Sequence, residues 1–134
     1  DTSTMQSNGT DYVSWCWDAG DTTVTNNDGE VPTQVRSNGD FSIFTADQLS
    51  TRVYLGHGLN SIPGMIFAKA TNKGFSRWYI QFPGIMPTST TLTFNAGAVV
   101  SDNTWSTIDD KTIRFQSNNA LGDTTDWVFY CWAE

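Results

Sequence analysis

The chain has 134 residues, a formal net charge of −7, 13% aromatic residues and only 16% charged residues. This length suits one domain that buries a core, and so many rings exclude a disordered chain. The acidic balance excludes nucleic-acid binding by phosphate neutralisation, and no apolar run approaches the ~20 residues of a membrane span, so we expect neither a nucleic-acid partner nor membrane insertion.

The beginning of the chain, DTST, contains neither an initiator Met nor a signal peptide, so we expect a processed protein or a piece of a longer one. The next segment, residues 12–17, is rich in aromatic residues and forms the first predicted strand. Helix signals are scarce. The best candidate is residues 45–52, where Thr45 would cap the helix and Asp47 would lie in its first turn.

Strand signals are far more frequent. About eight short strands, at intervals of ~8–15 residues, are typical of a sandwich or a barrel. In chain order they are predicted at residues 12–17, 41–44, 52–55, 65–69, 75–82, 90–95, 112–116 and 127–132.

The period of two indicates how these strands are covered. Residues 65–68 are all apolar, so both sides of that strand are expected to be covered, whereas polar and apolar residues mix in 76–81, so one side is expected to meet water. A parallel sheet needs crossover helices, which this sequence does not supply. The prediction is therefore an all-β chain, an antiparallel two-layer β-sandwich that is jelly-roll-like and has little helix.

One segment of the chain occurs twice. Residues 10–17, TDYVSWCW, match residues 125–132, TDWVFYCW, at five of eight positions, with an offset of 115 residues. At two further positions one aromatic residue replaces another. Because Cys and Trp are rare, the shared Cys-Trp pair indicates a unit of roughly 115 residues whose final strand appears twice. The alternative is that two edge strands have converged on a similar aromatic pattern.

The repeat divides the chain. Residues 1–20 are expected to be the terminal strand of a preceding repeat, or a strand that completes this unit's own sheet. Residues 21–134 are expected to form a single β-sandwich domain. In either case the parent molecule is expected to be a tandem or elongated assembly.

Several motifs follow one another in order along the chain. They are the segments 12–17 and 127–134, the turn at 27–29, the segments 35–38 and 40–43, the motif Gly56-His57-Gly58-Leu59, Pro63, the strand 65–69, Trp78-Tyr79 and Trp105. Together they resemble a repeat domain of marine bacteriophage virion proteins, in particular tail-fibre and other appendage proteins of phages that infect cyanobacteria. Units of that family end in Tyr-[Val/Ile]-Ala-[Tyr/Trp]-Cys-[Phe/Trp]-Ala-Glu, the pattern that residues 12–17 and 127–134 match. Ser14 and Phe129 depart from the small Ala of the pattern, and residues 83–87 have no match in it.

This resemblance implies a non-enzymatic structural virion protein, a β-sandwich module of a tail fibre or other external appendage that acts in assembly and host attachment. It implies a virion location and partners among other virion proteins and other copies of the chain, with a trimer as the expected homo-oligomer. Two alternatives stay open. One is a capsid decoration or head-fibre protein that binds the shell, and the other is a carbohydrate-binding or carbohydrate-cleaving module with a host surface glycan as its partner.

The residues that could carry chemistry are few. His57 is the only His, and because glycines flank it we expect a structural role in a turn rather than catalysis or metal binding. Cys16 and Cys131 occupy equivalent positions of the repeat, and we expect two buried thiols that act as small hydrophobic side chains.

The acidic groups do not form a convincing site. Residues 26–30 faintly resemble a calcium loop but lack its spaced oxygen ligands, and Asp109-Asp110 is a pair of neighbours whose side chains are expected to point apart. We therefore expect no catalytic residue, no metal and no cofactor. Aromatic rings in loops can stack on sugars, and Trp105, which lies in a polar stretch, is the candidate ligand-binding residue. Of Trp78 and Tyr79, which alternate on a strand, one is expected to face outward.

Overall fold

A computed structural model describes residues 11, 13–73, 77–94, 98–101, 104–116 and 124–134. These residues contain eleven strands and no helix. The strands are β1 (Val24–Asn26), β2 (Thr33–Ser37), β3 (Phe41–Leu49), β4 (Arg52–Gly56), β5 (Pro63–Ala70), β6 (Trp78–Gln81), β7 (Thr90–Thr93), β8 (Ala98–Ser101), β9 (Trp105–Ile108), β10 (Thr112–Gln116) and β11 (Thr125–Ala133).

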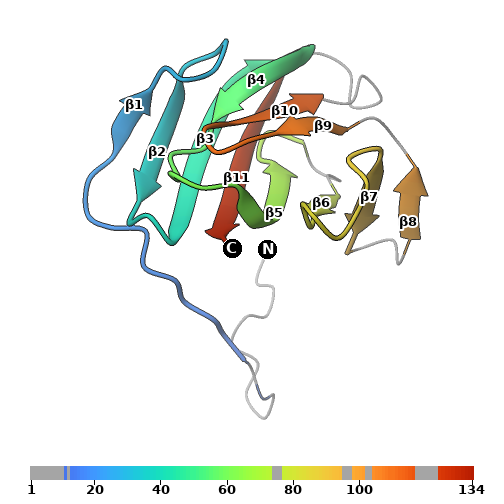
Figure 1. The fold of residues 1–134 in the computed structure, drawn as a ribbon, viewed down its shortest axis with the longest axis horizontal. Helices are drawn as coiled ribbons and strands as arrows, with labels where there is room; N and C mark the ends of the chain where they lie inside the picture. The colour runs from blue at the N-terminus through green and yellow to red at the C-terminus, as the bar shows by residue number, and fades with distance from the viewer. Residues whose placement is uncertain (1–10, 12, 74–76, 95–97, 102–103, 117–123) are drawn as a thin grey trace.

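The strands form two sheets packed face to face. The larger has eight strands in the order β1-β2-β3-β11-β5-β6-β7-β8, and the smaller has three in the order β4-β10-β9. All pairs of named strands are antiparallel. Figure 1 shows β4, β10 and β9 passing in front of the larger sheet, with β11 between β3 and β5. The prediction of an all-β antiparallel two-layer sandwich is confirmed.

The central strand β11 supplies most of the core. Its residues alternate between buried and half-buried, with Trp127, Phe129 and Cys131 facing the smaller sheet. The Phe129 ring stacks on Phe44 of β3, with centroids 4.6 Å apart and planes 6° apart. The Phe115 ring of β10 meets Phe129 edge to face at 5.0 Å. Such ring pairs contribute about 0.5–1.5 kcal/mol each beyond the burial of their area.

Most predicted strands are present. The strand predicted at 112–116 has the same bounds as β10, and those predicted at 41–44, 52–55, 65–69 and 127–132 lie within β3, β4, β5 and β11. The strand predicted at 75–82 corresponds to the shorter β6, because residues 77 and 82 are not part of a strand, and residues 75–76 lie outside the described residues. The strand predicted at 90–95 corresponds to the shorter β7, and residue 95 is likewise not described. Strands β1, β2, β8 and β9 were not predicted.

The predicted helix at 45–52 is wrong. Residues up to Leu49 continue β3, because Phe44 and Ala46 alternate into the core while the backbone pairs with β11. Gln48 then adopts a φ of 55°, and its N–H donates to Asp126 Oδ1 at 2.8 Å. Tertiary pairing thus overrides the local capping signal.

The first predicted strand is also wrong. Residues 13–17 run without regular secondary structure and pair with neither sheet, and residue 12 lies outside the described residues. The later copy of the repeat, residues 125–132, forms a central strand, whereas described residues 13–17 of the earlier copy have no neighbouring strand.

The expected burial of the two faces of β5 and of β6 needs correction. In β5, Ile66 and Ala68 are buried, but Met65 and Phe67 on the other side are only half-buried. In β6 the expected wet side is limited to the half-buried Trp78, because Ile80 and Gln81 are both buried. The Gln81 amide is satisfied there, since its Nε2 donates to the carbonyl oxygens of Pro87 and Thr90, both at 3.1 Å.

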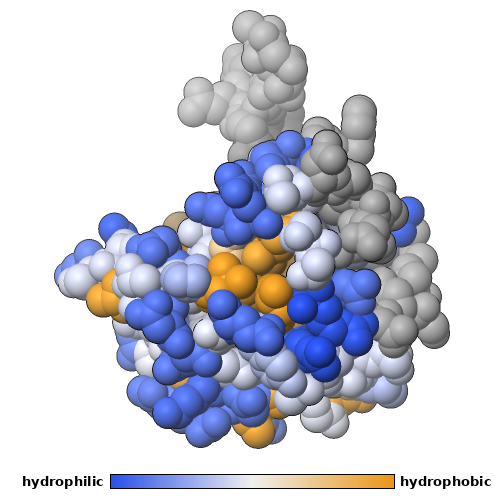
Figure 2. All heavy atoms as spheres, turned by 90° about the horizontal axis from the view of Figure 1, so that it is seen from above, coloured by the Kyte–Doolittle hydropathy of each residue, from blue (hydrophilic) through white to orange (hydrophobic). Residues whose placement is uncertain are grey.

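Seen from above, the surface is mostly hydrophilic, with hydrophobic side chains gathered in a recess near its middle (Figure 2). None of the described residues belongs to a helix able to cross a bilayer.

Replacing Phe129 by Ala tests the central ring stack. We expect the Phe129→Ala variant to lose about 3–5 kcal/mol of unfolding free energy, because it leaves a cavity between Phe44 and Phe115. Urea unfolding followed by tryptophan fluorescence measures the loss. The control is Val24→Ala at an exposed position, which should stay within about 0.5 kcal/mol of the parent chain. Similar losses for both variants would contradict the central role of the stack.

Candidate functional site

A hollow of about 390 Å³ lies on the outer face of the larger sheet, the face turned away from the smaller sheet. We call it the aromatic hollow. It is lined by residues of β3, β5, β6 and β11 and of the segment before β1, namely Trp15, Trp17, Ala19, Phe41, Ile43, Phe67, Trp78, Tyr130 and Trp132.

The pairing register places these side chains together. Tyr130 of β11 lies opposite both Ile43 of β3 and Phe67 of β5. Trp132 lies opposite Phe41. Because directly opposite residues share a face of the sheet, the outward residues of three neighbouring strands form one continuous apolar patch.

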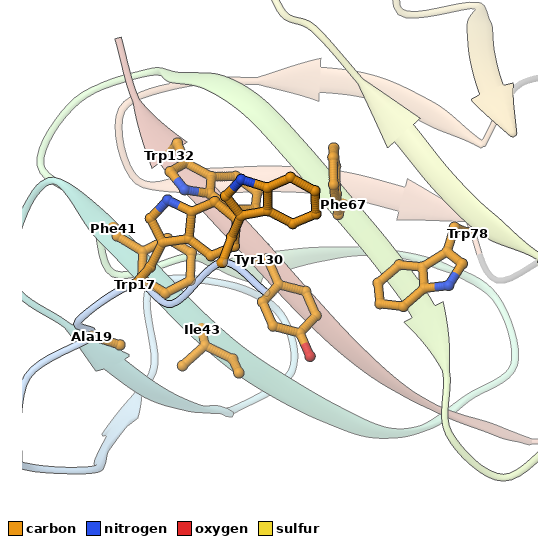
Figure 3. Close-up of a pocket in the computed structure, with 9 residues that line it drawn as sticks. Trp17, Ala19, Phe41, Ile43, Phe67, Trp78, Tyr130 and Trp132 are labelled. Atoms are coloured by element: carbon orange, nitrogen blue, oxygen red, sulfur yellow. The ribbon is translucent and has the colours of Figure 1, made fainter. Parts of the chain in front are cut away.

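The rings contact one another across the hollow. Trp132 meets Trp17 at 5.2 Å, Phe41 at 5.0 Å and Phe67 at 5.2 Å between ring centroids. Trp78 lies 6.0 Å from Tyr130. In Figure 3 the rings of Trp17, Trp132 and Phe41 gather at one end of the hollow, and Trp78 stands at the other.

Polar groups are sparse in this hollow. None of the nine lining residues carries a carboxylate, an imidazole, an amine or a thiol. The ammonium group of Lys69 lies 5.5 Å from the Trp78 ring centroid. The indole Nε1 of Trp132 is buried and has no hydrogen-bond partner in the described structure. The arrangement can bind an apolar or flat surface, and the Tyr130 hydroxyl is the one titratable group among the nine lining residues.

The rings of the leading segment remain largely exposed. Trp15 is 72% exposed and Trp17 is 53% exposed, although Trp17 contacts both Phe41 and Trp132. Contiguous exposed apolar patches on a soluble domain mark interaction sites. The aromatic hollow is therefore the candidate functional site.

The structure corrects the expectation for Trp105. This residue begins β9 and is only 1% exposed, with its ring 5.0 Å from that of Phe115 in the core. A ring enclosed in this way has no face to offer to a ligand, so Trp105 is not a ligand-binding residue. Of the other pair, Tyr79 is buried against Trp127 while Trp78 lines the hollow, as expected from their alternation.

His57 has the structural role that the sequence indicated. The side chain is fully buried, and its Nδ1 accepts the backbone N–H of Leu59 at 3.1 Å. The ring proton therefore lies on Nε2, which donates to the carbonyl oxygen of Asp109 at 3.1 Å. Burial lowers the pKa of His57 below its ordinary value of 6.5, which keeps the ring neutral.

The acidic residues singled out in the sequence serve turns. The Asp109 carboxylate accepts the backbone N–H groups of Lys111 and Thr112 at 2.9 and 2.6 Å. Partial burial would raise the pKa of Asp109, but these hydrogen bonds hold it below its usual value. In the loop at 26–30, Asn26 Oδ1 accepts the N–H of Asp28 and Glu30 Oε2 accepts the N–H of Tyr54. No group of three His, Cys, Asp or Glu suited to a metal occurs in the part of the chain that the structure describes.

The two cysteines differ. Both are free, and Cys131 is buried, as expected, with burial raising the pKa of its thiol. Cys16 is exposed, which contradicts the expectation of a second buried thiol. The reason is that residues 13–17 lack the strand neighbours that enclose Cys131 in β11.

Sequence reasoning missed the hollow as a site, although its signals were present. Residues 127–132 are apolar at every position, so a strand there has an apolar outer face as well as an apolar inner one. The contributions of Phe41, Ile43 and Phe67 depend on which strands flank β11, and this order is not visible in the sequence.

The model of a family described as "Domain of unknown function (DUF7483)" matches residues 1–134, and the chain belongs to this family. Comparison with curated proteins and with solved structures gives no match.

The buried His57 predicts a pH dependence of stability. Because the folded state lowers the pKa of His57, its contribution is fully present above pH 6.5 and is lost as the pH falls through and below 6.5. Asp109, whose pKa is also lowered, loses its contribution only as the pH falls below 3.8. We therefore expect the unfolding free energy to decrease between pH 7 and pH 5, as measured by urea unfolding at each pH.

The His57→Gln variant separates this effect from that of the carboxylates. Its overall stability is expected to be lower, but its unfolding free energy should vary less between pH 7 and pH 5 than that of the parent chain. An equal slope in both proteins would show that His57 is not the group responsible.

Proposed function

We propose that this member of the DUF7483 family is a non-catalytic structural module of a bacteriophage virion, located in a tail fibre or another external appendage. It would act by binding, both to neighbouring proteins during assembly and to the host during attachment. The observation that carries the proposal is the aromatic hollow, a surface built from ring faces on the outer side of a rigid eight-stranded sheet.

The chemistry of the described residues supports contact rather than turnover. Two of the titratable side chains that the sequence singled out, His57 and Asp109, are bonded to turn backbone and lie outside the hollow. Trp, Tyr and Phe are enriched at protein interfaces because they bury a large area at a low cost in conformational entropy. The hollow combines all three.

The virion location is supported by the sequence resemblance, which covers nearly the whole chain in order. A repeated unit suits elongated particle components, since stacking of similar units extends a fibre. The net charge of −7 would keep copies soluble and limit adhesion to DNA. Partners would be other copies of the chain, with a trimer as the fibre-type expectation, and neighbouring virion proteins.

Particle localisation tests the proposal. An antiserum raised against the recombinant chain should label purified virions of the encoding phage at the tail fibres or another appendage, in immunogold electron microscopy. The same antiserum absorbed with the recombinant chain is the control. Labelling over the capsid lattice would instead favour the decoration or head-fibre alternative. Absence of the chain from purified virions, checked by mass spectrometry, would overturn the proposal.

Carbohydrate binding is a second candidate, favoured by the ring faces of Trp78 and Tyr130 at the hollow. Here we expect binding on a glycan array that Trp78→Ala abolishes and that the core-facing Tyr79→Phe variant retains. The absence of signal at high protein concentration would contradict this candidate and leave the structural proposal intact.

A further inference from the structure

We infer that residues 13–17 belong to the closing strand of a second sandwich unit of the same fold, placed before this one in the polypeptide, and that Trp17 is a rigid aromatic joint between the two units. This inference rests on the repeat and on contacts of the described residues. It does not depend on a virion location.

The first step is that the two copies of the repeat differ in strand pairing, although their sequences are similar. The later copy of the repeat, within β11, is hydrogen-bonded on both sides, to β3 and to β5. Described residues 13–17 of the leading copy pair with no strand. A segment with the side chains of a central strand is therefore present without the sheet that such side chains require.

The second step is the direction of the side chains. In β11, Val128, Tyr130 and Trp132 face outward and are half-buried, while Phe129 and Cys131 enter the core. Their counterparts in the leading copy are Val13, Trp15 and Trp17 on one side, and Ser14 and Cys16 on the other. All five counterparts are exposed here. They would be covered if the segment were paired as β11 is paired.

The third step is that Trp17 already contacts this unit. Its ring lies 5.2 Å from Trp132 at 77°, and 6.2 Å from Phe41. Trp17 is 53% exposed, and this exposed part of the ring can pack on the outer face of the preceding unit. One indole would then belong to two aromatic clusters, one on each unit.

The fourth step is that the chain after Trp17 is held in place. The Asp18 carbonyl oxygen accepts the Asn38 side-chain amide at 3.0 Å, and Asp18 Oδ1 accepts the N–H of Gly20 at 2.7 Å. Gly20 adopts a φ of 75°, which favours glycine. Connections between domains are mobile by default unless contacts fix them. Here the ring contacts of Trp17 and the bonds of Asp18 hold the connection against the turn between β2 and β3.

The occupant of the exposed strand is therefore a unit in the same polypeptide rather than a separate chain. The slot between β3 and β5 of an intact unit is already filled by that unit's own β11. A free copy of the chain thus offers residues 13–17 only the edge of a sheet and no vacant central position between β3 and β5, whereas a preceding unit in tandem would use them as its own last strand.

A two-unit chain tests the joint. In the designed fusion, residues 1–132 of a first copy are joined directly to residues 18–134 of a second copy. The end of β11 in the first copy then stands where residues 10–17 stand in the single chain. A matched protein carries a Gly-Ser linker of about ten residues at the junction. Fluorescence anisotropy decay of a dye on Cys16 reports tumbling, since Cys16 is exposed and Cys131 is buried. We expect the direct fusion to tumble about twofold more slowly than the spaced fusion, because a fixed joint makes one body of two domains.

Variants of the direct fusion identify the residue responsible. Replacing the junction Trp by Ala should restore the tumbling of the spaced fusion. Trp78→Ala in the second unit removes a Trp side chain from the same face, at a position whose ring lies beside Phe67 and Tyr130, and should leave the slow tumbling unchanged. Equal tumbling of the direct and spaced fusions, or equal effects of the two substitutions, would overturn the inference.

A measurement on the single chain covers the case in which a fusion does not fold. Cleavage by a protease specific for Asp, at Asp18 and Asp21, should become about tenfold faster in Trp17→Ala, because the anchor of the segment is lost and the segment opens locally. Trp15→Ala should leave the rate unchanged. If the two variants behave alike, or if sedimentation shows the parent chain to dimerise in a way that Trp15→Ala abolishes, the tandem joint is wrong.

Discussion

The structure depends on one strand that is apolar on both faces. β11 lies at the centre of the larger sheet and pairs with β3 and β5. Its inner side chains, Trp127 and Phe129, pack against Phe115 of the smaller sheet. This ring cluster joins the two layers, so the strand that orders the larger sheet also holds the sandwich together.

The outer face of the same strand explains the candidate site. One face of an antiparallel sheet commonly meets water and is polar. Here Tyr130 and Trp132 point outward, and Phe41 and Phe67 flank Trp132 from the neighbouring strands. The leading segment covers only part of this surface, since Trp15 and Trp17 stay largely exposed. A surface of this kind is suited to a partner, and both the proposed appendage role and the inferred joint make use of it.

Two polar residues of the fold that could be taken for catalytic groups, His57 and Asp109, form hydrogen bonds with turn backbone instead. His57 joins the end of β4 to the turn before β10 through Leu59 and the carbonyl oxygen of Asp109. Asp109 in turn closes the tight turn between β9 and β10 through Thr112. Buried polar groups that bond to backbone in this way fix loop geometry at little cost in desolvation. The groups most easily taken for catalytic residues are thus those that shape the loops.

The sequence alone determined the fold class and most strands, because an apolar period of two and the scarcity of helix caps depend only on neighbouring residues. It also determined that Trp78 and Tyr79 face opposite ways and that His57 serves a turn. Only the tertiary structure decided that residues 45–49 extend β3, that Trp105 is enclosed, and that residues 13–17 remain unpaired. These features depend on which distant segments lie side by side, above all on the placement of β11 between β3 and β5, and long-range pairing leaves no signal in a local pattern.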